Sequence, residues 1–265
     1  MLLATDIGNT NITLGIFDED KNFINEFRIP SDKDLSMGEY EVILKSLLKE
    51  YEIDSCIIAS VVEELNIKFR QAVENVFKIK SIFVTCEINL GIKIIADNPH
   101  EVGADRIANA VAAANKYKEQ AVIVIDFGTA TTFDIINSKG EFCGGIIAPG
   151  LKTQLKSLNS STSKLPKTEV SISQNAIGHN TTEAILSGVI RGSACMVDGL
   201  IEQCEKELGE SVIIIATGGY CGLISNYLKR SFTSINPILT LEGLEKIYYL
   251  NSKSSNSKEN FKQQI

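Results

Sequence analysis

The sequence predicts an α/β protein of two similar domains, each a mixed sheet flanked by helices, with a cleft between them. Strand-like apolar runs alternate with amphipathic helical stretches along most of the 265 residues, as is typical of α/β folds. The strand and turn pattern of the first thirty residues returns over 121–147, and no Pro- or Gly-rich linker separates the halves. We therefore expect an N-terminal domain over 1–118, a C-terminal domain over 119–251 and a polar, disordered tail over 252–265.

The elements of the first half follow from local pattern alone. Three apolar runs joined by the turns GNTN and DEDKN predict a meander of strands at 2–7, 12–18 and 23–29. Apolar runs and helical periodicity then alternate, which predicts a helix at 40–51, a strand at 55–61, a helix at 63–77, a strand at 81–85 and an alanine-rich helix at 103–117.

The second half opens with a copy of the first three strands. Aligning Asp6 with Asp126 places Gly8 on Gly128 and Asn11 on Thr131, and the following strands and turns then match as well. The sequence thus indicates an internal duplication. The remaining patterns predict a helical region at 181–208 broken by glycines, a strand at 212–219 and helices at 220–230 and 240–251.

Composition narrows the class of protein. The net charge of −7 argues against a general nucleic-acid binder, which needs a surplus of Lys and Arg. No apolar run approaches the roughly 20 residues of a membrane span, and the N-terminus lacks the basic region of a secretory signal. The six cysteines show no CxxC spacing, so we expect buried thiols in a reducing compartment, the cytoplasm.

The segment DIGNTNIT (6–13) carries the first candidate chemistry. A carboxylate ends a strand, a glycine follows that lets main chain approach an anion, and polar side chains supply donors. Asp6 suits Mg²⁺, which prefers hard oxygen ligands and retained water. An ordinary hairpin with an Asx turn explains the same residues, but the repeat at DFGTATT (126–132) favours a pair of phosphate-binding turns.

The segment GADR (103–106) lies where a turn enters the alanine-rich helix. A carboxylate at a helix start is favourable with the helix dipole, without any further role. A kinase, however, needs a base beside the acceptor hydroxyl and a cation near phosphate. Asp105 and Arg106 provide these two groups.

Two other glycine-rich segments are less specific. GGIIAPGLKT (144–153) resembles a P-loop, but Leu151 separates the second glycine from Lys152-Thr153, so a Walker-type ATPase is rejected. ATGGYCG (216–222) places two glycines between a strand and a helix. Either a nucleotide contact or a tight turn explains them.

Together these motifs resemble the type III pantothenate kinases of the acetate and sugar kinase and actin superfamily. The resemblance runs from residue 1 to about 250. It covers DIGNTNIT, NPHEVGADR (98–106), IDFGTATTFD (125–134), GGIIAPGLK (144–152), IGHNTTEAILSG (177–188) and ATGGY (216–220). It implies two duplicated RNase H-like (actin-like ATPase) domains. It also implies transfer of the γ-phosphate of ATP to the primary alcohol of pantothenate, giving 4'-phosphopantothenate in the first step of coenzyme A biosynthesis.

The resemblance assigns roles motif by motif. Asp105 would accept the proton of the pantothenate hydroxyl, and Asp126 would hold a monovalent cation, K⁺ or NH₄⁺. The residues that would bind ATP with Mg²⁺ are Asp6, Ile7, Gly8, Asn9, Thr10, Asn11, Ile12, Thr13 and Thr129. Those that would line the pantothenate site are Gly103, Ala104, Asp105, Arg106 and Thr181. One position departs from the family: Ala96 stands where a substrate-contacting Tyr is common, so the resemblance implies a remodelled or looser substrate pocket here.

The resemblance also implies a second subunit at the pantothenate site. Small residues in the helical region 181–208, namely Gly188, Gly192, Ser193 and Ala194, permit close helix approach. We therefore expect a homodimer with this region at or near the interface, although an intrachain contact would explain the same residues.

Two other functions stay open. Phosphatases that act on polyphosphate or guanosine polyphosphates share duplicated Asp-x-Gly turns. A non-catalytic nucleotide-binding regulator could use the same fold, although the presence of Asp105 argues against it.

Overall fold

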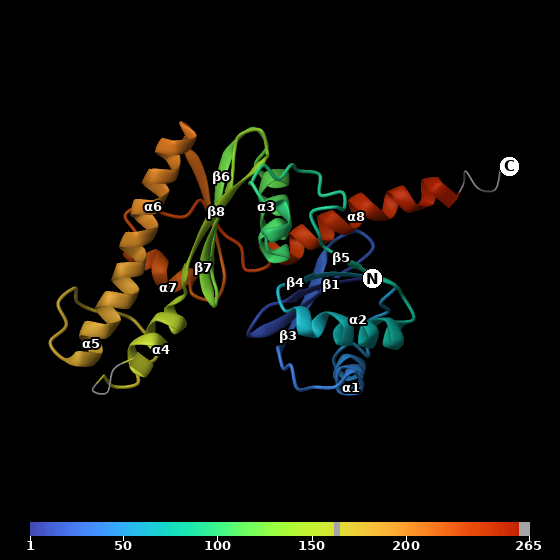
Figure 1. Ribbon diagram of the computed structural model, residues 1–265, viewed down its shortest axis with the longest axis horizontal. Coiled ribbons are helices and arrows are strands. Elements are labelled where there is room, and N and C mark those ends of the chain that lie inside the picture. Colours follow the sequence, from blue (N-terminus) through green and yellow to red (C-terminus); the bar gives the residue numbers. More distant parts are fainter. Residues whose placement is uncertain (162–164, 260–265) are drawn as a thin grey trace. The chain divides into compact units, whose positions relative to one another are not determined.

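Two five-stranded mixed sheets organise the chain (Figure 1). The computed structural model describes residues 1–161 and 165–259, with residues 253–259 described by their backbone alone. The first sheet has the order β3-β2-β1-β4-β5, and the second has the matching order β8-β7-β6-β9-β10. The predicted duplication of a three-stranded unit is confirmed, and each copy is extended by two further strands.

The strands of the two sheets correspond one to one. In the first sheet they are β1 (Leu2–Ile7), β2 (Asn11–Phe17), β3 (Phe23–Pro30), β4 (Ser55–Ser60) and β5 (Ser81–Phe83). In the second they are β6 (Ala121–Phe127), β7 (Ala130–Ile136), β8 (Phe142–Pro149), β9 (Val212–Thr217) and β10 (Ser234–Ile235). The first three strands of each set pair antiparallel. β4 pairs parallel with β1, and β5 with β4; in the second set β9 pairs parallel with β6, and β10 with β9.

The register of the duplication differs from the sequence alignment by one residue. Asp6 pairs with Thr13, and Asp126 pairs with Thr132, so equivalent positions lie 119 residues apart after the first turn. Asn11 therefore corresponds to Ala130, and its alignment on Thr131 is wrong. The second turn is one residue shorter, and sequence matching without a gap could not show this.

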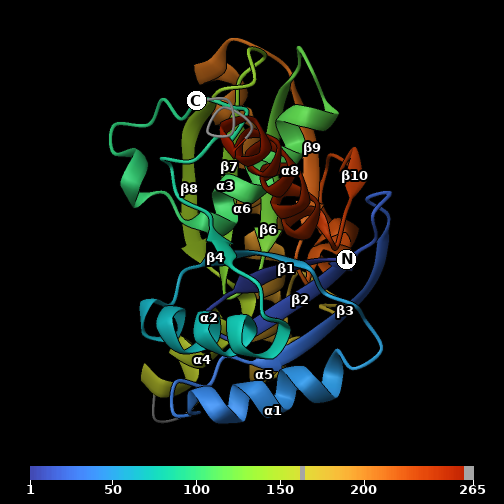
Figure 2. The same cartoon turned by 90° about the vertical axis from the view of Figure 1, so that its right-hand side faces the viewer.

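Two helices cover one face of the first sheet, α1 (Met37–Leu47) and α2 (Glu63–Phe77) (Figures 1 and 2). Their buried side chains pack on the apolar side chains of β1, β2 and β4. Helix α2 has the predicted bounds, whereas α1 begins earlier than the predicted residue 40. Ser36 and Glu39 form a capping box that starts α1. The Ser36 side chain accepts from the N–H of Glu39, and the Glu39 side chain accepts from the N–H of Ser36.

Helix α8 (Leu239–Glu259) packs with the first sheet, although the sequence placed residues 239–251 in the second domain. A Cβ on Gly15 would come within 2.7 Å of Leu241, and a Cβ on Gly243 would collide with the carbonyl of Ala108 in α3 (Ala104–Lys116). The two units are thus Met1–Ala112 with Leu239–Ile265, and Ala113–Ile238. The helix continues past residue 252, where we expected the tail to begin, and 260–265 lie outside the described residues.

The core of the second unit lies between its sheet and a long helical region. This region comprises α5 (Thr181–Leu186), a π-helical turn η2 (Ser187–Arg191) and α6 (Gly192–Leu208). The predicted breaks near Gly188 and Gly192 correspond to the π turn η2, which interrupts the α-helix, whereas the break predicted near Gly199 is wrong because α6 runs through that residue. Thr181–Leu208 is long and apolar enough to span a membrane, but 56% of its most apolar window is buried. Its apolar side chains pack against the second sheet, as in a core helix.

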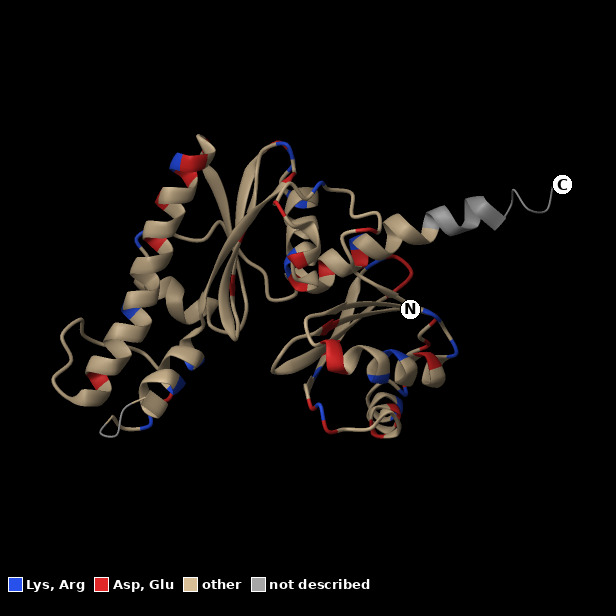
Figure 3. Cartoon of the chain, in the orientation of Figure 1, with Lys and Arg blue, Asp and Glu red and all other residues tan. Residues whose placement is uncertain are grey.

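Shorter helices complete both units: η1 (Pro99–Glu101), α4 (Leu151–Ser161), α7 (Cys221–Ile224) and η3 (Ser225–Tyr227). Charged residues gather on helices and turns, while the strands carry few of them (Figure 3). The expectation of buried thiols is wrong in part. Cys56 and Cys221 are buried, but Cys195 is exposed, and all six cysteines are free.

Candidate active site

The first turn, Gly8–Asn11, joins β1 to β2 directly after Asp6. The N–H of Gly8 donates to the carbonyl of Asn11 at 3.0 Å, and a Cβ on Gly8 would lie 3.2 Å from that carbonyl oxygen. The side chains of Asn9, Thr10 and Asn11 are exposed. Ile7 and Ile12 are fully buried in the core, so these two predicted residues could offer a nucleotide only their main chain.

The second turn, Gly128–Ala130, follows Asp126 in the equivalent place. The N–H of Gly128 donates to the carbonyl of Ala130 at 3.0 Å. Thr129 is exposed at its tip, and its carbonyl accepts from the N–H of Gly150 at 3.1 Å. Asp126 thus lies at the end of β6, and Thr129 lies in the turn that follows it.

Gly218 packs against the strand that carries Asp126. Strand β9 pairs parallel with β6, so that Thr217 lies beside Asp126. Gly218 then turns with φ +86, and a Cβ there would collide with Asp126 Oδ1 and lie 2.6 Å from the N atom of Phe127. Only glycine combines this φ with this approach. The ATGG segment is therefore a tight turn that leaves the Asp126 carboxylate in place.

Asp105 lies in the first turn of α3, and its carboxylate folds back on its own backbone. Its Oδ1 accepts from the N–H of Arg106 at 2.8 Å. Burial raises the pKa of the Asp105 carboxyl above the ordinary value, and the N–H and charge of Arg106 oppose this shift only in part. A carboxylate that is costly to ionise binds a proton more readily, which is the property of a general base.

The GADR segment lies at the edge of the first sheet where β1 and β4 end. The N–H of Val61, directly after β4, donates to the carbonyl of Ile7 at 3.1 Å. A Cβ on Gly103 would lie 3.5 Å from Cγ1 of Val61. Since Ile7 ends β1 and the first turn begins at the next residue, GADR and the first turn lie at the same end of the first sheet, within one unit.

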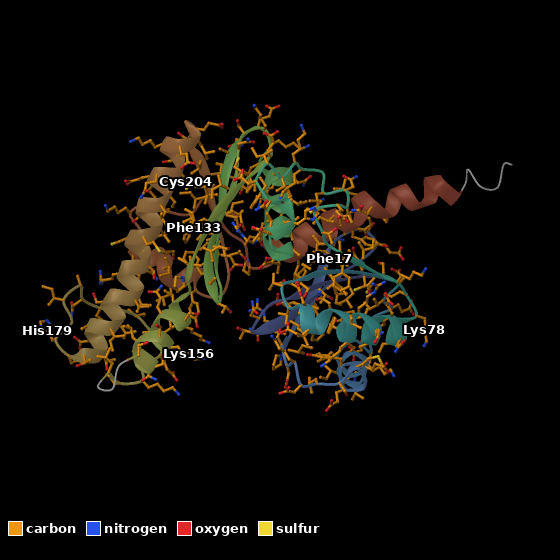
Figure 4. The ribbon with its side chains drawn as sticks, viewed as in Figure 1. Phe17, Lys78, Phe133, Lys156, His179 and Cys204 are labelled. Carbon is orange, nitrogen blue, oxygen red and sulfur yellow. The ribbon has the colours of Figure 1, made fainter. Side chains whose placement is uncertain are left out.

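Thr181 begins α5 in the second unit and is exposed. Asn180 caps the helix by accepting from the N–H of Glu183 at 2.9 Å. The Glu183 carboxylate accepts from the N–H of His179 at 2.9 Å and from the Asn180 amide at 2.7 Å, and these bonds lower its pKa. Figure 4 labels His179 on the loop that leads into α5. Thr181 therefore lies directly after a capped helix start.

No group of three or more His, Cys, Asp or Glu side chains among the described residues could hold a metal ion. Single strand-end carboxylates are what Mg²⁺ needs when phosphates and water complete its shell. Asp6 and Asp126 therefore each offer one strand-end carboxylate to an ion whose other ligands are phosphate and water.

The comparison with known families decides the identity. The sequence profile of the type III pantothenate kinases matches residues 2–203. The chain belongs to the type III pantothenate kinase family. The type III pantothenate kinase of Citrifermentans bemidjiense is 40% identical over 95% of this chain and 100% of its own length. That of Dehalococcoides mccartyi is 41% identical over 94% of this chain and 96% of its own length.

Solved structures confirm the predicted pair of RNase H-like, actin-like ATPase domains. The activator of 2-hydroxyisocaproyl-CoA dehydratase from Clostridium difficile, with bound ADPNP, has a TM-score of 0.55 at 13% identity, and the match covers 97% of each chain. A ROK family glucokinase from Streptomyces griseus, in complex with glucose and AMPPNP, has a TM-score of 0.50 at 14% identity, with coverage of 95% and 99%. At such identities these two solved structures show the fold alone.

Sequence reasoning missed three residues that donate hydrogen bonds to carbonyls of the two turns: Ser31 to Thr10 and Gly8, and Gly150 and Thr153 to Thr129. Ser31 and Gly150 follow Pro30 and Pro149, which end the third strand of each copy. The repeated proline was the available signal. The two prolines are recognised as equivalent only when the one-residue shift in register is known, because they lie 119 residues apart.

Proposed function

We propose that this chain phosphorylates the primary alcohol of pantothenate with ATP, with Asp105 as the general base. The alcohol oxygen forms a bond to the γ-phosphorus, the bond from that phosphorus to the β–γ bridging oxygen breaks, and the alcohol proton passes to Asp105. The products are ADP and 4'-phosphopantothenate. The observation that carries the proposal is the partly buried Asp105 carboxylate at the same sheet edge as the first turn.

The residues that bind ATP in this proposal are the segment Asp6–Thr13 and Thr129. Because Ile7 and Ile12 are buried, binding would use main-chain N–H groups and the exposed polar side chains of the first turn. A Mg²⁺ ion held near Asp6 would offset the charge on the phosphates as the γ-phosphoryl group moves. Phosphoryl transfer asks little covalent work of the protein, so positioning and charge dominate.

Pantothenate binding is proposed for the GADR segment and Thr181. Gly103 and Ala104 would contribute main chain, since Ala104 is buried, and Arg106 would contribute a positive charge. The Asn180 cap fixes the main chain at the start of α5, from which the exposed Thr181 side chain extends. These assignments rest on the family motifs and on the local geometry of each segment.

A monovalent cation, K⁺ or NH₄⁺, is proposed at Asp126. The support is the second strand-end carboxylate, which lies at the end of β6 in the place that Asp6 has at the end of β1. Equal steady-state rates in sodium-only and potassium buffers, at saturating Mg²⁺, would contradict this proposal.

A homodimer in the cytoplasm is also proposed. Gly188 and Gly192 are exposed on the long helical region, whereas Ser193 and Ala194 are buried in the core of their own unit and cannot reach a partner. A single-chain mass of 29.0 kDa in light scattering across micromolar concentrations would reject the dimer.

A coupled assay tests the function directly. Purified protein is given ATP, Mg²⁺, K⁺ and pantothenate, and ADP formation and the phosphorylated product are measured together. Product formed in equal amount with ADP supports the kinase. Phosphate release from polyphosphate or guanosine polyphosphates without pantothenate would indicate the phosphatase alternative, and ATP binding without turnover would indicate a regulator.

A further inference from the structure

In each of the two turns, a carbonyl accepts a hydrogen bond from the residue that follows the third strand of the same sheet. The N–H of Ser31 donates to the carbonyl of Thr10 at 3.0 Å, and the N–H of Gly150 donates to that of Thr129 at 3.1 Å. Both pairs are equivalent at the spacing of 119 residues. The contact is therefore a repeated feature of the fold, present in both copies although the turns differ in length.

A hydroxyl group adds a second bond in each copy, but from different places. The Ser31 hydroxyl donates to the carbonyl of Gly8. In the second copy the donor is Thr153, in the first turn of α4, whose Oγ1 lies 2.7 Å from the carbonyl of Thr129. Gly150 itself can carry no side chain, because a Cβ there would collide with the carbonyl of Gly128 and lie 2.6 Å from that of Thr129.

These bonds decide which way the peptide groups of the turns point. In a trans peptide the C=O and the N–H that follows it point in opposite directions. A Gly8 carbonyl held toward Ser31 turns the N–H of Asn9 away from Ser31, and the held Thr10 carbonyl does the same for Asn11. In the second turn the held Thr129 carbonyl turns the N–H of Ala130 away from Gly150.

We propose that Ser31 and Thr153 are positioning residues that keep main-chain N–H groups of the turns directed at the phosphates of ATP. The inference rests on the proposed binding of ATP by these turns. A turn whose peptide flips would present carbonyl oxygens to phosphate, which repel it, so a bond that prevents the flip favours ATP without touching it. Pantothenate binding does not depend on these peptide groups.

Kinetics with the two substrates varied separately tests the proposal, with ATP affinity measured by calorimetry. Ser31→Ala should raise the KM for ATP roughly 3- to 10-fold, the range expected for one hydrogen bond. The KM for pantothenate should change by less than about twofold. Thr153→Val, which keeps the side-chain volume, should act alike, whereas Ser31→Thr and Thr153→Ser keep the hydroxyl and should restore the KM for ATP.

Matched variants separate the outcomes. Ser160→Ala also removes a hydroxyl bond to a carbonyl, that of Ser157 at 3.2 Å, and should leave both KM values unchanged. If Asp6→Asn weakens use of Mg²⁺–ATP while Ser31→Ala and Thr153→Val do not, the positioning role is wrong and ATP binding by the turns stands. If none of the three changes ATP affinity, the turns do not bind ATP. Equal rises in both KM values would also overturn the positioning role. Should Ser31→Ala fail to fold, Thr153→Val carries the same test.

Discussion

The Oδ1 atom of Asp105 lies 2.5 Å from the position that a Cβ on Gly103 would occupy. The same oxygen accepts the N–H of Arg106 at 2.8 Å. Glycine at position 103 therefore leaves the room in which the carboxylate folds back over the start of α3. A residue with a Cβ at position 103 would displace the Asp105 carboxylate, which explains the glycine of GADR.

Gly103→Ala should displace the Asp105 carboxylate while the fold persists, because the group in the way is the end of a side chain. We expect kcat to fall roughly 10- to 100-fold, as for a misplaced catalytic group, with ATP affinity unchanged. Gly38→Ala is the matched control, since a Cβ there meets nothing within 4 Å. Wild-type kcat in a folded Gly103→Ala protein would contradict the role of this contact.

Asp105→Asn and Asp6→Asn should fail in different ways. Asp105→Asn keeps shape but cannot accept a proton, so kcat should fall by roughly 10² to 10⁴ while ATP binding survives. Asp6→Asn should raise the Mg²⁺ concentration needed for half-maximal rate. Steady-state kinetics and calorimetry distinguish the two, with Asp20→Asn in an exposed turn as the control for loss of charge. Near wild-type turnover of pantothenate by Asp105→Asn would reject the base.

The raised pKa of Asp105 predicts an effect on stability with a definite sign. Burial raises this pKa in the folded protein. The folded state therefore binds the Asp105 proton more tightly than the unfolded state does, and this stabilising contribution is fully present below the unfolded-state pKa. That contribution is lost as the pH rises through the folded-state value. Asp105→Asn, which resembles the protonated form, should therefore have a higher Tm than wild type at neutral pH. The difference should vanish toward about pH 3, below the unfolded-state pKa near 3.9. A Tm difference that is the same at both pH values would contradict the burial effect.

Gly218→Ala and Gly219→Ala form a pair of neighbours with opposite expectations. Gly218 has φ +86 and no room beside Asp126, whereas a Cβ on Gly219 meets nothing within 4 Å. The left-handed conformation alone costs an alanine roughly 1–2 kcal/mol, which corresponds to a fall in Tm of roughly 3–8 °C for a unit of this size. Gly219→Ala should leave Tm nearly unchanged. Calorimetric melting of both variants checks this, and equal Tm values would show that the contact with Asp126 is not tight.

Local pattern was sufficient for most of the elements and for the two Asp-x-Gly turns. Helix α2 and strands β1 and β6 depend on residues close in sequence, so their bounds were predicted within a residue. The start of α1 was misplaced because the capping pair Ser36 and Glu39 precedes the apolar periodicity. The two-residue strand β10 was missed, since its pairing with β9 leaves almost no pattern in the sequence.

By itself the sequence determined the family, the duplication and the candidate carboxylates, because each is carried by a short run of residues with its own chemistry. Only the tertiary structure decided three other matters: the one-residue shift between the copies, the packing of α8 on the first sheet, and the hold of Ser31, Gly150 and Thr153 on the turns. These depend on contacts between distant residues. Pairing register and the approach of Leu241 to Gly15 arise only when strands and helices meet, and hydrophobic pattern within one segment carries no information about such partners.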